Sequence, residues 1–410
     1  MSAAHYLSLA WRNLGRNRRR TVVTGAAISL GMALFIIVVA IEDGSYRDLV
    51  RHGVSQVAGH VVIQGEGYHE NPQVTTTVPS TSEVVGLTLE EIEDARLVRR
   101  TFVQGLLSSP AGASGIEMFG IEPIPEAEIN QLSDRLIAGS WVETDIDIVI
   151  GRLLADTLDV GLGDRVVLMA SRRGELESWL FRVSGVFETG IDEMDGFLAL
   201  AHISAIQEMM VLGEEVHQIS VHLEDPRHTR RIADAVRDTL ANRELEVLPW
   251  QEALPELYEL MIFDQAATFF VLGIVALIVA LGILNTVLMS VMERMREFGV
   301  LLSLGLSPRR LGTVVLMEAM ILGACSLAIG IGIGLLASWP LTVWGIDAAA
   351  LLGDTVEVGG LAWDMHIYAH VYPERVILFA AAGLVITLLA TLYPVLKTSR
   401  IQPIEAMHRQ

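Results

Sequence analysis

Four apolar runs limit what this chain can fold into, because each is long enough to cross a membrane as a helix. Crossing a hydrocarbon core about 30 Å thick takes roughly 20 helical residues. The chain has 410 residues, of which 51% are hydrophobic and 19% charged, an unusual composition for a soluble protein. We therefore predict an α-helical membrane protein with four transmembrane helices, over Thr21–Ile41, Ala266–Ser290, Leu311–Ser338 and Val376–Leu396.

The polar stretch 42–265, between the first and second runs, is long enough for a large folded domain. Its patterns predict an α+β domain with a β-rich lobe near residues 140–200. Helices are expected at Leu87–Arg96, at Arg152–Leu158 and over Gln251–Phe263, the last running directly into the second membrane helix. Strands are expected at His60–Gln64, Leu97–Leu107, Gly115–Ile121, Arg165–Ala170, Leu176–Phe187 and His217–Leu223.

The distribution of basic residues predicts the orientation. Arginines gather before the first run, in the connection 291–310 and in the tail 397–410, and short Lys/Arg-rich segments stay in the cytoplasm. Both termini are therefore expected inside, with 42–265 and the loop 339–375 outside. Residues 1–20 read as an amphipathic helix at the cytoplasmic interface, or as a segment that only enforces topology, through Arg12, Arg16, Arg18, Arg19 and Arg20.

Composition and motifs also exclude several functions. Most acidic residues lie in the external domain, and a net charge of −20 argues against nucleic-acid binding. The sequence has no HExxH, no GxSxG and no GxxxxGK[ST], so we predict that the chain is not an enzyme and binds neither ATP nor a metal itself. Cys325 is the only cysteine, which leaves no intrachain disulfide.

The connection 291–310 is short, charged and helical in pattern. Gly305 is suited to ending its helix, and Ser307-Pro308 to starting the next. A helix this short is not stable alone in water, so it should rest against another surface. Val300, Leu301, Leu302 and Leu304 are expected to form one apolar side.

Three motifs resemble one known family. Glu293–Leu311 (ERMREFGVLLSLGLSPRRL) is similar to the loop between the second and third membrane helices of the FtsX/MacB/LolC–LolE permeases, which are ABC transporter subunits. Ala10–Thr21 (AWRNLGRNRRRT) resembles the entry to their first membrane helix, and Tyr393–Arg409 (YPVLKTSRIQPIEAMHR) their C-terminal end. The resemblance implies a MacB-like periplasmic domain, an inner-membrane location and a cytoplasmic coupling helix.

The same resemblance implies the partners. Two copies of a separate ATPase subunit, which bind ATP and Mg, would dock on the coupling helix through Glu293, Arg294, Arg296, Glu297, Phe298, Gly299 and Gly305. A second permease subunit, identical or related, would complete the membrane part. The segment Gly59–Tyr68 (GHVVIQGEGY) and the lack of a fused ATPase are most like LolC/LolE, which implies lipoprotein cargo and a periplasmic carrier.

Other functions stay open at this point. Within the family they are efflux of drugs or peptides from the periplasm and transmembrane activation of a cell-wall enzyme. From a different class, a ligand sensor without transport is the alternative.

Small and polar residues within the runs suggest how the helices contact one another. Small residues allow close approach of two helices, which is the role expected for Gly25, Ser29, Gly330 and Gly334. Asn285 is expected to make an interhelical hydrogen bond. Glu318 is expected to lie near the interface with a structural partner, the alternative being an intramembrane functional acid.

Overall fold

The computed structural model describes residues 18–54, 57–92, 95–172, 174–190, 192–304, 307–347, 357–358, 361–362 and 366–398. Two compact units are present. Of the described residues, those within 1–45, 262–346 and 367–410 form the helical unit, and those within 46–261 and 347–366 form the α+β unit. The predicted fold class, four apolar helices together with an α+β domain, is confirmed.

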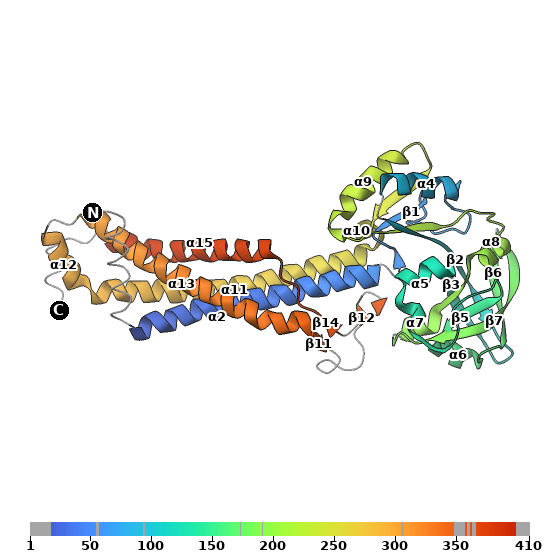
Figure 1. The fold of residues 1–410 in the computed structure, drawn as a ribbon, viewed down its shortest axis with the longest axis horizontal. Coiled ribbons are helices and arrows are strands. Elements are labelled where there is room, and N and C mark those ends of the chain that lie inside the picture. Colours follow the sequence, from blue (N-terminus) through green and yellow to red (C-terminus); the bar gives the residue numbers. More distant parts are fainter. Residues whose placement is uncertain are drawn as a thin grey trace. The chain divides into compact units, whose positions relative to one another are not determined.

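Four helices are long and apolar enough to cross a membrane: α2 (Arg18–Asp48), α11 (Pro255–Glu293), α13 (Pro308–Val343) and α15 (Pro373–Thr398) (Figure 1). The short helix α12 (Met295–Ser303) lies between α11 and α13 in the chain. Arg18, Arg19 and Arg20 already belong to α2, so this part of the expected interfacial segment continues the first membrane helix. Arg12 and Arg16 lie outside the described residues.

The helix expected over Gln251–Phe263 does run directly into the second membrane span from Pro255, but it is interrupted at Leu254. Helix α10 (Trp250–Ala253) ends at Leu254, whose φ of −128° and ψ of 66° are not helical, and α11 begins at Pro255. The proline ring clashes with a helical conformation of the residue before it, which breaks the helix at this point. Ser307 and Pro308 start α13 as expected, whereas Gly305 lies outside the described residues.

One part of the α+β unit is an antiparallel sheet of four strands, in the order β10 (Leu245–Pro249), β1 (Val61–Gly65), β9 (Gln218–His222) and β2 (Arg96–Ser108). Helices α4 (Thr81–Glu91) and α9 (Thr229–Thr239) share its apolar core through Val84 and Val236, both fully buried. Strands β9 and β10 flank β1 and are joined through α9, which makes a split βαβ unit.

The long strand β2 also belongs to a closed ring of six strands. The ring runs from β2 through β3 (Ala113–Ile121), β8 (Leu198–His202), β5 (Asp147–Gly151), β7 (Glu175–Phe187) and β6 (Arg165–Arg172) back to β2. Leu107, Met118, Ile150, Leu168 and Phe181 lie in its core and are each at most 1% exposed. The β-rich lobe predicted near residues 140–200 therefore also contains β2 and β3, which come earlier in the sequence.

The remaining elements are short. They are α5 (Pro123–Ile129), α6 (Arg152–Leu158), α7 (Asp192–Phe197) and α8 (Ile203–Met210), strand β4 (Leu136–Gly139) on β7, a π-helix (Leu49–Val54), 3₁₀ turns (Gln131–Ser133, Pro226–His228) and the two-residue strands β11 (Ile346–Asp347), β12 (Glu357–Val358), β13 (Leu361–Ala362) and β14 (His366–Ile367).

The predicted helix at Leu87–Arg96 is misplaced, because α4 ends at Glu91 and β2 begins at Arg96. Thr88 lies inside α4, where its hydroxyl donates to the Val84 carbonyl at 2.8 Å.

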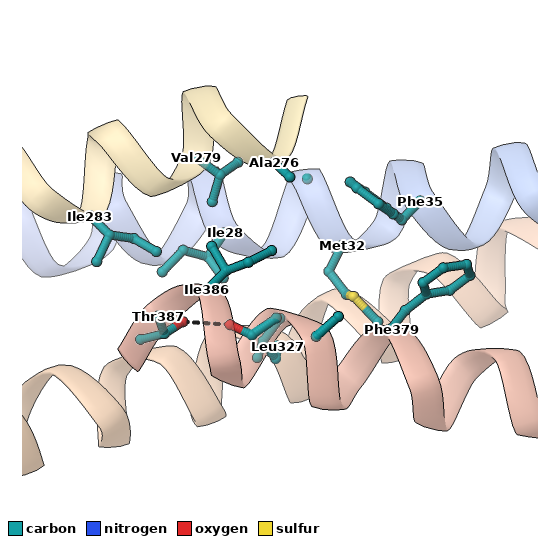
Figure 2. A pocket seen from close by; sticks show the side chains of 13 residues that line it. Ile28, Met32, Phe35, Ala276, Val279, Ile283, Leu327, Phe379, Ile386 and Thr387 are labelled. Carbon is teal, nitrogen blue, oxygen red and sulfur yellow. Dashed lines mark hydrogen bonds between the residues drawn. The ribbon is translucent and has the colours of Figure 1, made fainter. Parts of the chain in front are cut away.

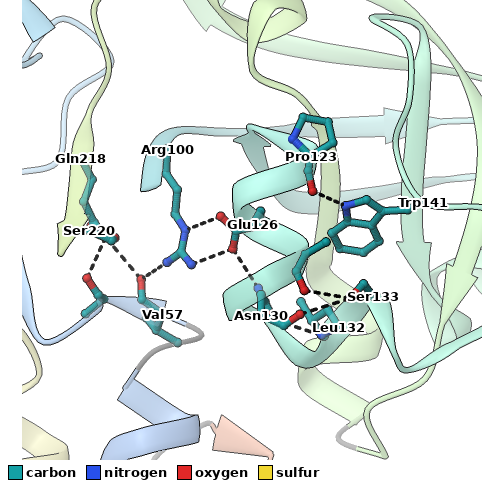
Figure 3. A network of polar contacts seen from close by, with 12 residues as sticks. Val57, Arg100, Pro123, Glu126, Asn130, Leu132, Ser133, Trp141, Gln218 and Ser220 are labelled. Carbon is teal, nitrogen blue, oxygen red and sulfur yellow. Dashed lines mark hydrogen bonds and ion pairs between the residues drawn. The ribbon is translucent and has the colours of Figure 1, made fainter. Parts of the chain in front are cut away.

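A fully buried ion pair connects the two parts of the α+β unit (Figure 3). The Arg100 guanidinium on β2 donates twice to the Glu126 carboxylate on α5, at 2.6 and 3.0 Å, and neither side chain is exposed. Its third donor reaches the Val57 carbonyl at 2.9 Å, and Asn130 donates to Glu126 at 3.0 Å. The charges are thus paired and hydrogen-bonded, as buried charges must be.

Two histidines are buried side by side in the α+β unit. The rings of His60 (4% exposed) and His222 (7%) lie 6.0 Å apart. His60 Nδ1 accepts from the Leu223 amide, while His60 Nε2 and both His222 nitrogens have no hydrogen-bond partner in the described part of the chain. Burial lowers the pKa of His60 to about 4, and burial with nearby Arg100, His60 and Arg96 lowers the pKa of His222 well below its usual value.

We predict that the α+β unit loses stability as the pH falls below about 6.5. An unfolded histidine binds a proton near pH 6.5, whereas folded His60 stays neutral down to about pH 4. Proton binding therefore favours the unfolded state. At pH 5, His60 alone should lower the free energy of unfolding by about 2 kcal/mol. The measurement is hydrogen exchange of the slowest β1 and β9 amides in the full chain. The double variant His60→Gln/His222→Phe should reduce this pH dependence, leaving the part due to buried His217, whose pKa burial also lowers. Exposed His69→Gln should leave the dependence unchanged, and an unchanged slope in the double variant contradicts the assignment.

Arg100→Met should destabilise the α+β unit by about 3–5 kcal/mol, because it leaves the Glu126 carboxylate buried without its partner. The double variant Arg100→Met/Glu126→Leu should be less destabilised than Arg100→Met, because it removes both charges. The matched control is Arg243→Met, which breaks a surface pair with Glu83 and should destabilise the unit far less than Arg100→Met. Equal losses in Arg100→Met and Arg243→Met, by hydrogen exchange, would exclude a special role for the buried pair.

Candidate functional site

Helix α12 packs with one face on the helical unit. Arg294 separates it from α11 with φ −102° and ψ 14°, outside the regular helical range. Phe298 (3% exposed) and Leu302 (8%) join the apolar core of the four spans, and Gly299 is also buried. This short helix is therefore held by tertiary packing, which supplies the stability that its length alone does not.

The opposite face of α12 is exposed. Val300 is 53% exposed and Leu304, directly after the helix, is 79% exposed, and both lie among the exposed side chains of Arg296 and Glu297. The prediction of one apolar side was wrong: Leu302 points inward, while Val300 and Leu304 do not, and the Leu301 side chain lies outside the described set. We define the outer face of α12 as Arg296, Glu297, Val300 and Leu304. Exposed apolar side chains ringed by charges are typical of a contact surface.

Ion pairs connect this region to two of the spans. Arg294 Nη1 lies 3.0 Å from Glu318 Oε2 on α13, and Arg294 Nε lies 3.3 Å from Glu297 Oε2 on α12. The Arg294 guanidinium also covers the Phe298 ring, 5.4 Å from its centroid. Arg20 on α2 pairs with Glu293 at the end of α11, at 2.9 Å. Because the Arg294 and Glu318 side chains are only 12% and 15% exposed, water screens their pair less than it screens a surface pair.

The small residues predicted for packing all lie between α2 and α13. Ser29 Oγ donates to the Ser326 carbonyl at 2.7 Å. A Cβ at Gly330 would lie 2.6 Å from the Ser29 carbonyl oxygen, and one at Gly334 would lie 2.9 Å from Ile36. A Cβ at Gly25 would lie 3.0 Å from Ser326. The two backbones therefore approach one another too closely for larger side chains.

Asn285 does not take the role expected from the sequence. It is exposed on α11 and makes no hydrogen bond with any residue that the structure describes. Its neighbour Thr286 makes the interhelical contact instead, with its hydroxyl 2.8 Å from that of Thr24 on α2. Thr286 follows Val279 and Ile283 at helical spacing on the packed side of α11, and this periodicity is the signal that could have identified it.

A further ion pair, missed from the sequence, lies at the other end of the helical unit. Asp43 Oδ1 on α2 is 2.6 Å from Arg375 Nη1 on α15, and the Asp43 side chain is 5% exposed. Nearby, a Cβ at Gly44 would lie only 1.7 Å from the Tyr368 carbonyl oxygen, so glycine is required there. The His370 amide donates to the Ala40 carbonyl at 2.7 Å. These contacts hold the segment before α15 against α2.

The described residues contain no group of three or more His, Cys, Asp or Glu side chains that could hold a metal ion. The region around α12 has an exposed surface on one side and ion pairs to α2 and α13 on the other. It could therefore pass a movement of a bound protein to these two spans.

Four apolar spans, an α+β unit that lies between the first two in the chain, and a short packed helix between the second and third define a class of membrane permease. Two family models match the chain, the MacB-like periplasmic core domain over residues 21–239 and the FtsX-like permease C-terminal domain over residues 269–403. The chain belongs to this FtsX/MacB family of ABC transporter permeases. It is a multi-pass inner-membrane protein whose α+β unit is the periplasmic domain.

Curated relatives include the lipoprotein-releasing system transmembrane protein LolC of Neisseria meningitidis serogroup B, 24% identical over 94% of this chain and 93% of that protein. LolC of Xylella fastidiosa (strain 9a5c) is 27% identical over 93% and 91%. The macrolide export ATP-binding/permease protein MacB of Wolinella succinogenes is 24% identical over 80% of this chain, but only 52% of that protein is covered.

We predict that Arg294→Met lowers the stability of the helical unit by about 1–3 kcal/mol, because Glu318 loses a charged partner in a poorly hydrated position. The matched control is Arg296→Met, two residues away on the exposed face, which should stay within about 0.5 kcal/mol. Unfolding of the full chain in detergent, followed by helical circular dichroism, measures both. If the two variants unfold alike, the Arg294–Glu318 pair does not hold α12 in place.

Proposed function

We propose that this chain is the permease subunit of an ABC transporter that releases lipoproteins from the inner membrane, driven by a separate ATPase subunit. The observation that carries the proposal is the outer face of α12. It exposes two apolar side chains in a charged surround, while Arg294, on its inner side, is paired with α13. Such a surface is suited to binding a soluble protein and passing its movement to the membrane helices.

The orientation proposed is both termini and α12 in the cytoplasm. Two copies of the ATPase would each bind ATP and Mg and contact the outer face of α12. Of the coupling residues, Arg296 and Glu297 are exposed on this face, Glu297 while it is paired with Arg294. Gly299 is buried, so its part is packing, and Glu293 and Arg294 act through their ion pairs with α2 and α13.

Displacement of α12 would reach the spans along these contacts. Arg294 connects α12 to α13, and α13 packs against α2 through Gly330 and Gly334. Both α2 and α11 also contribute residues to the periplasmic domain. A second permease subunit, identical or related, would supply the opposing helices, and a lipoprotein between them would be passed to a periplasmic carrier.

Lipoprotein is favoured as cargo because the LolC relatives match over more than nine-tenths of their length, whereas the MacB relative matches over about half. Efflux of drugs or peptides, activation of a cell-wall enzyme and ligand sensing without transport are the competing functions. They differ in what leaves the membrane and in whether an ATPase binds.

We predict that Leu304→Glu weakens binding of the cognate ATPase subunit at least about tenfold. Burying a leucine contributes roughly 1.5–3 kcal/mol, and burying a carboxylate in its place adds a further cost. The measurement is co-purification and ATPase turnover of the reconstituted complex. Leu89→Glu makes the same change at an exposed leucine of the periplasmic domain and should change neither. Normal binding by Leu304→Glu would remove the outer face of α12 as the docking surface.

The cargo is tested separately, in proteoliposomes that contain the complex and a triacylated lipoprotein. ATP should move the lipoprotein into the soluble fraction when a carrier is present. An active, ATP-hydrolysing complex that leaves the lipoprotein in the membrane would keep the permease assignment and exclude the lipoprotein.

A further inference from the structure

An apolar cleft lies between α2, α11 and α15 in the helical unit (Figure 2). Its walls include side chains of all three helices, and one residue of α13 also lines it; representative members are Ile28, Met32, Val279, Ile283, Leu327 and Ile386. These residues belong to helices that are apolar enough to span the membrane. The open side of the cleft therefore faces hydrocarbon.

The walls offer no polar group to a ligand. Thr387 is the one polar side chain of the lining, and its hydroxyl donates to the Gly383 carbonyl of its own helix at 2.8 Å. A headgroup, a peptide backbone or an ion would lose its hydration here without gaining a hydrogen bond. The chemistry of the cleft accepts hydrocarbon only.

The cleft exists because α15 packs closely on α13 and contacts α2 only locally. A Cβ at Gly383 would lie 2.7 Å from Leu327, and one at Gly323 would lie 2.7 Å from Thr387, so α13 and α15 are in tight contact. Against α2, Phe379 meets Phe35 edge to face with centroids 5.8 Å apart, and Figure 2 shows both rings at the same end of the cleft. Beyond this pair the side chains of α15 leave a gap toward α2 and α11.

The size of the gap decides between possible occupants. The enclosed part of the cleft is narrow, with a volume of about 60 Å³, and the rest of the gap is open to the surroundings. An α-helix with its side chains is about 10 Å wide, so a helix of a second copy does not enter this narrow part. An empty gap of this size would forfeit the dispersion contacts of its lining. One flexible hydrocarbon chain satisfies both limits.

We propose that the cleft binds one acyl chain of a bilayer phospholipid, which fills the space between α15 and the α2–α11 pair. The chain enters from the surrounding bilayer, and its headgroup stays outside because nothing in the cleft binds it. This lipid is part of the packing of the helical unit, and the proposal holds whatever cargo the transporter carries.

The test uses the full chain in nanodiscs of phosphatidylethanolamine, a fraction of which carries a diazirine in the acyl chain. Irradiation and peptide mass spectrometry should place adducts on the cleft residues of α2 and α15 at several times the level found on the exposed face of α11. Ala382→Phe, which fills the cleft, should lower cleft labelling about tenfold. Ala381→Phe is the matched control, because Ala381 is exposed and does not line the cleft; it should leave labelling within about twofold.

Equal cleft labelling in wild type and Ala382→Phe would overturn the proposal, and so would cleft labelling no higher than that of the exposed α11 face. Labelling that appears only when the diazirine is carried by an acylated lipoprotein would overturn it in favour of cargo. If Ala382→Phe fails to fold, Ala276→Phe fills the same cleft from α11 and serves in its place.

Discussion

Hydrocarbon supplies no hydrogen bonds, and this constraint decides where each kind of contact stands in the helical unit. The ion pairs between its described spans lie near the helix ends: Arg20–Glu293 and Arg294–Glu318 at one end, and Asp43–Arg375 at the other. Between them the helices meet through small side chains and through hydroxyls that bond to a backbone carbonyl or to one another, as Ser29 and Thr24 do. Charged side chains thus connect the helices near their ends, where water or headgroups reach. In the middle of the spans, the helices are held by close approach of their backbones.

Helix α2 is the element on which these contacts converge. Along its length it meets α11 through Arg20 and Thr24, α13 through Ser29, and α15 through Phe35 and Asp43. Its window of greatest hydropathy is 44% buried, against 11% for α11 and for α15. The first span is therefore the centre of the bundle, although its composition is as apolar as that of the others.

The sequence was sufficient for features that depend on local composition. The four spans follow from run length, and α6 occupies the predicted residues Arg152–Leu158 because its apolar positions repeat at helical spacing. The sequence was insufficient to predict which face of a helix packs against another helix. Val300 and Leu302 look alike in the sequence, yet packing buries only Leu302. The same holds for Asn285 and Thr286, where the more polar side chain is the one that faces outward.

Ion pairs between residues that are far apart in the chain could not be predicted from the sequence either. Asp43 and Arg375 are brought together only when α2 and α15 pack, and Arg100 meets Glu126 only when α5 folds against β2. The break at Leu254 is different, since the proline that follows it is a local signal whose effect was underestimated.

The different kinds of contact bear on how movement can pass through the helical unit. Between α2 and α13, Gly330 lies against the Ser29 backbone, which cannot rotate to absorb a shift, and between α13 and α15 the glycines Gly323 and Gly383 bring Thr387 and Leu327 into close packing. Helix α11 meets α2 through a hydroxyl pair and an ion pair, whose long or rotatable groups accommodate small displacements. Under the proposed function, α2, α13 and α15 would then move as one body, and α11, which leads directly into α12, would be the helix that shifts against it.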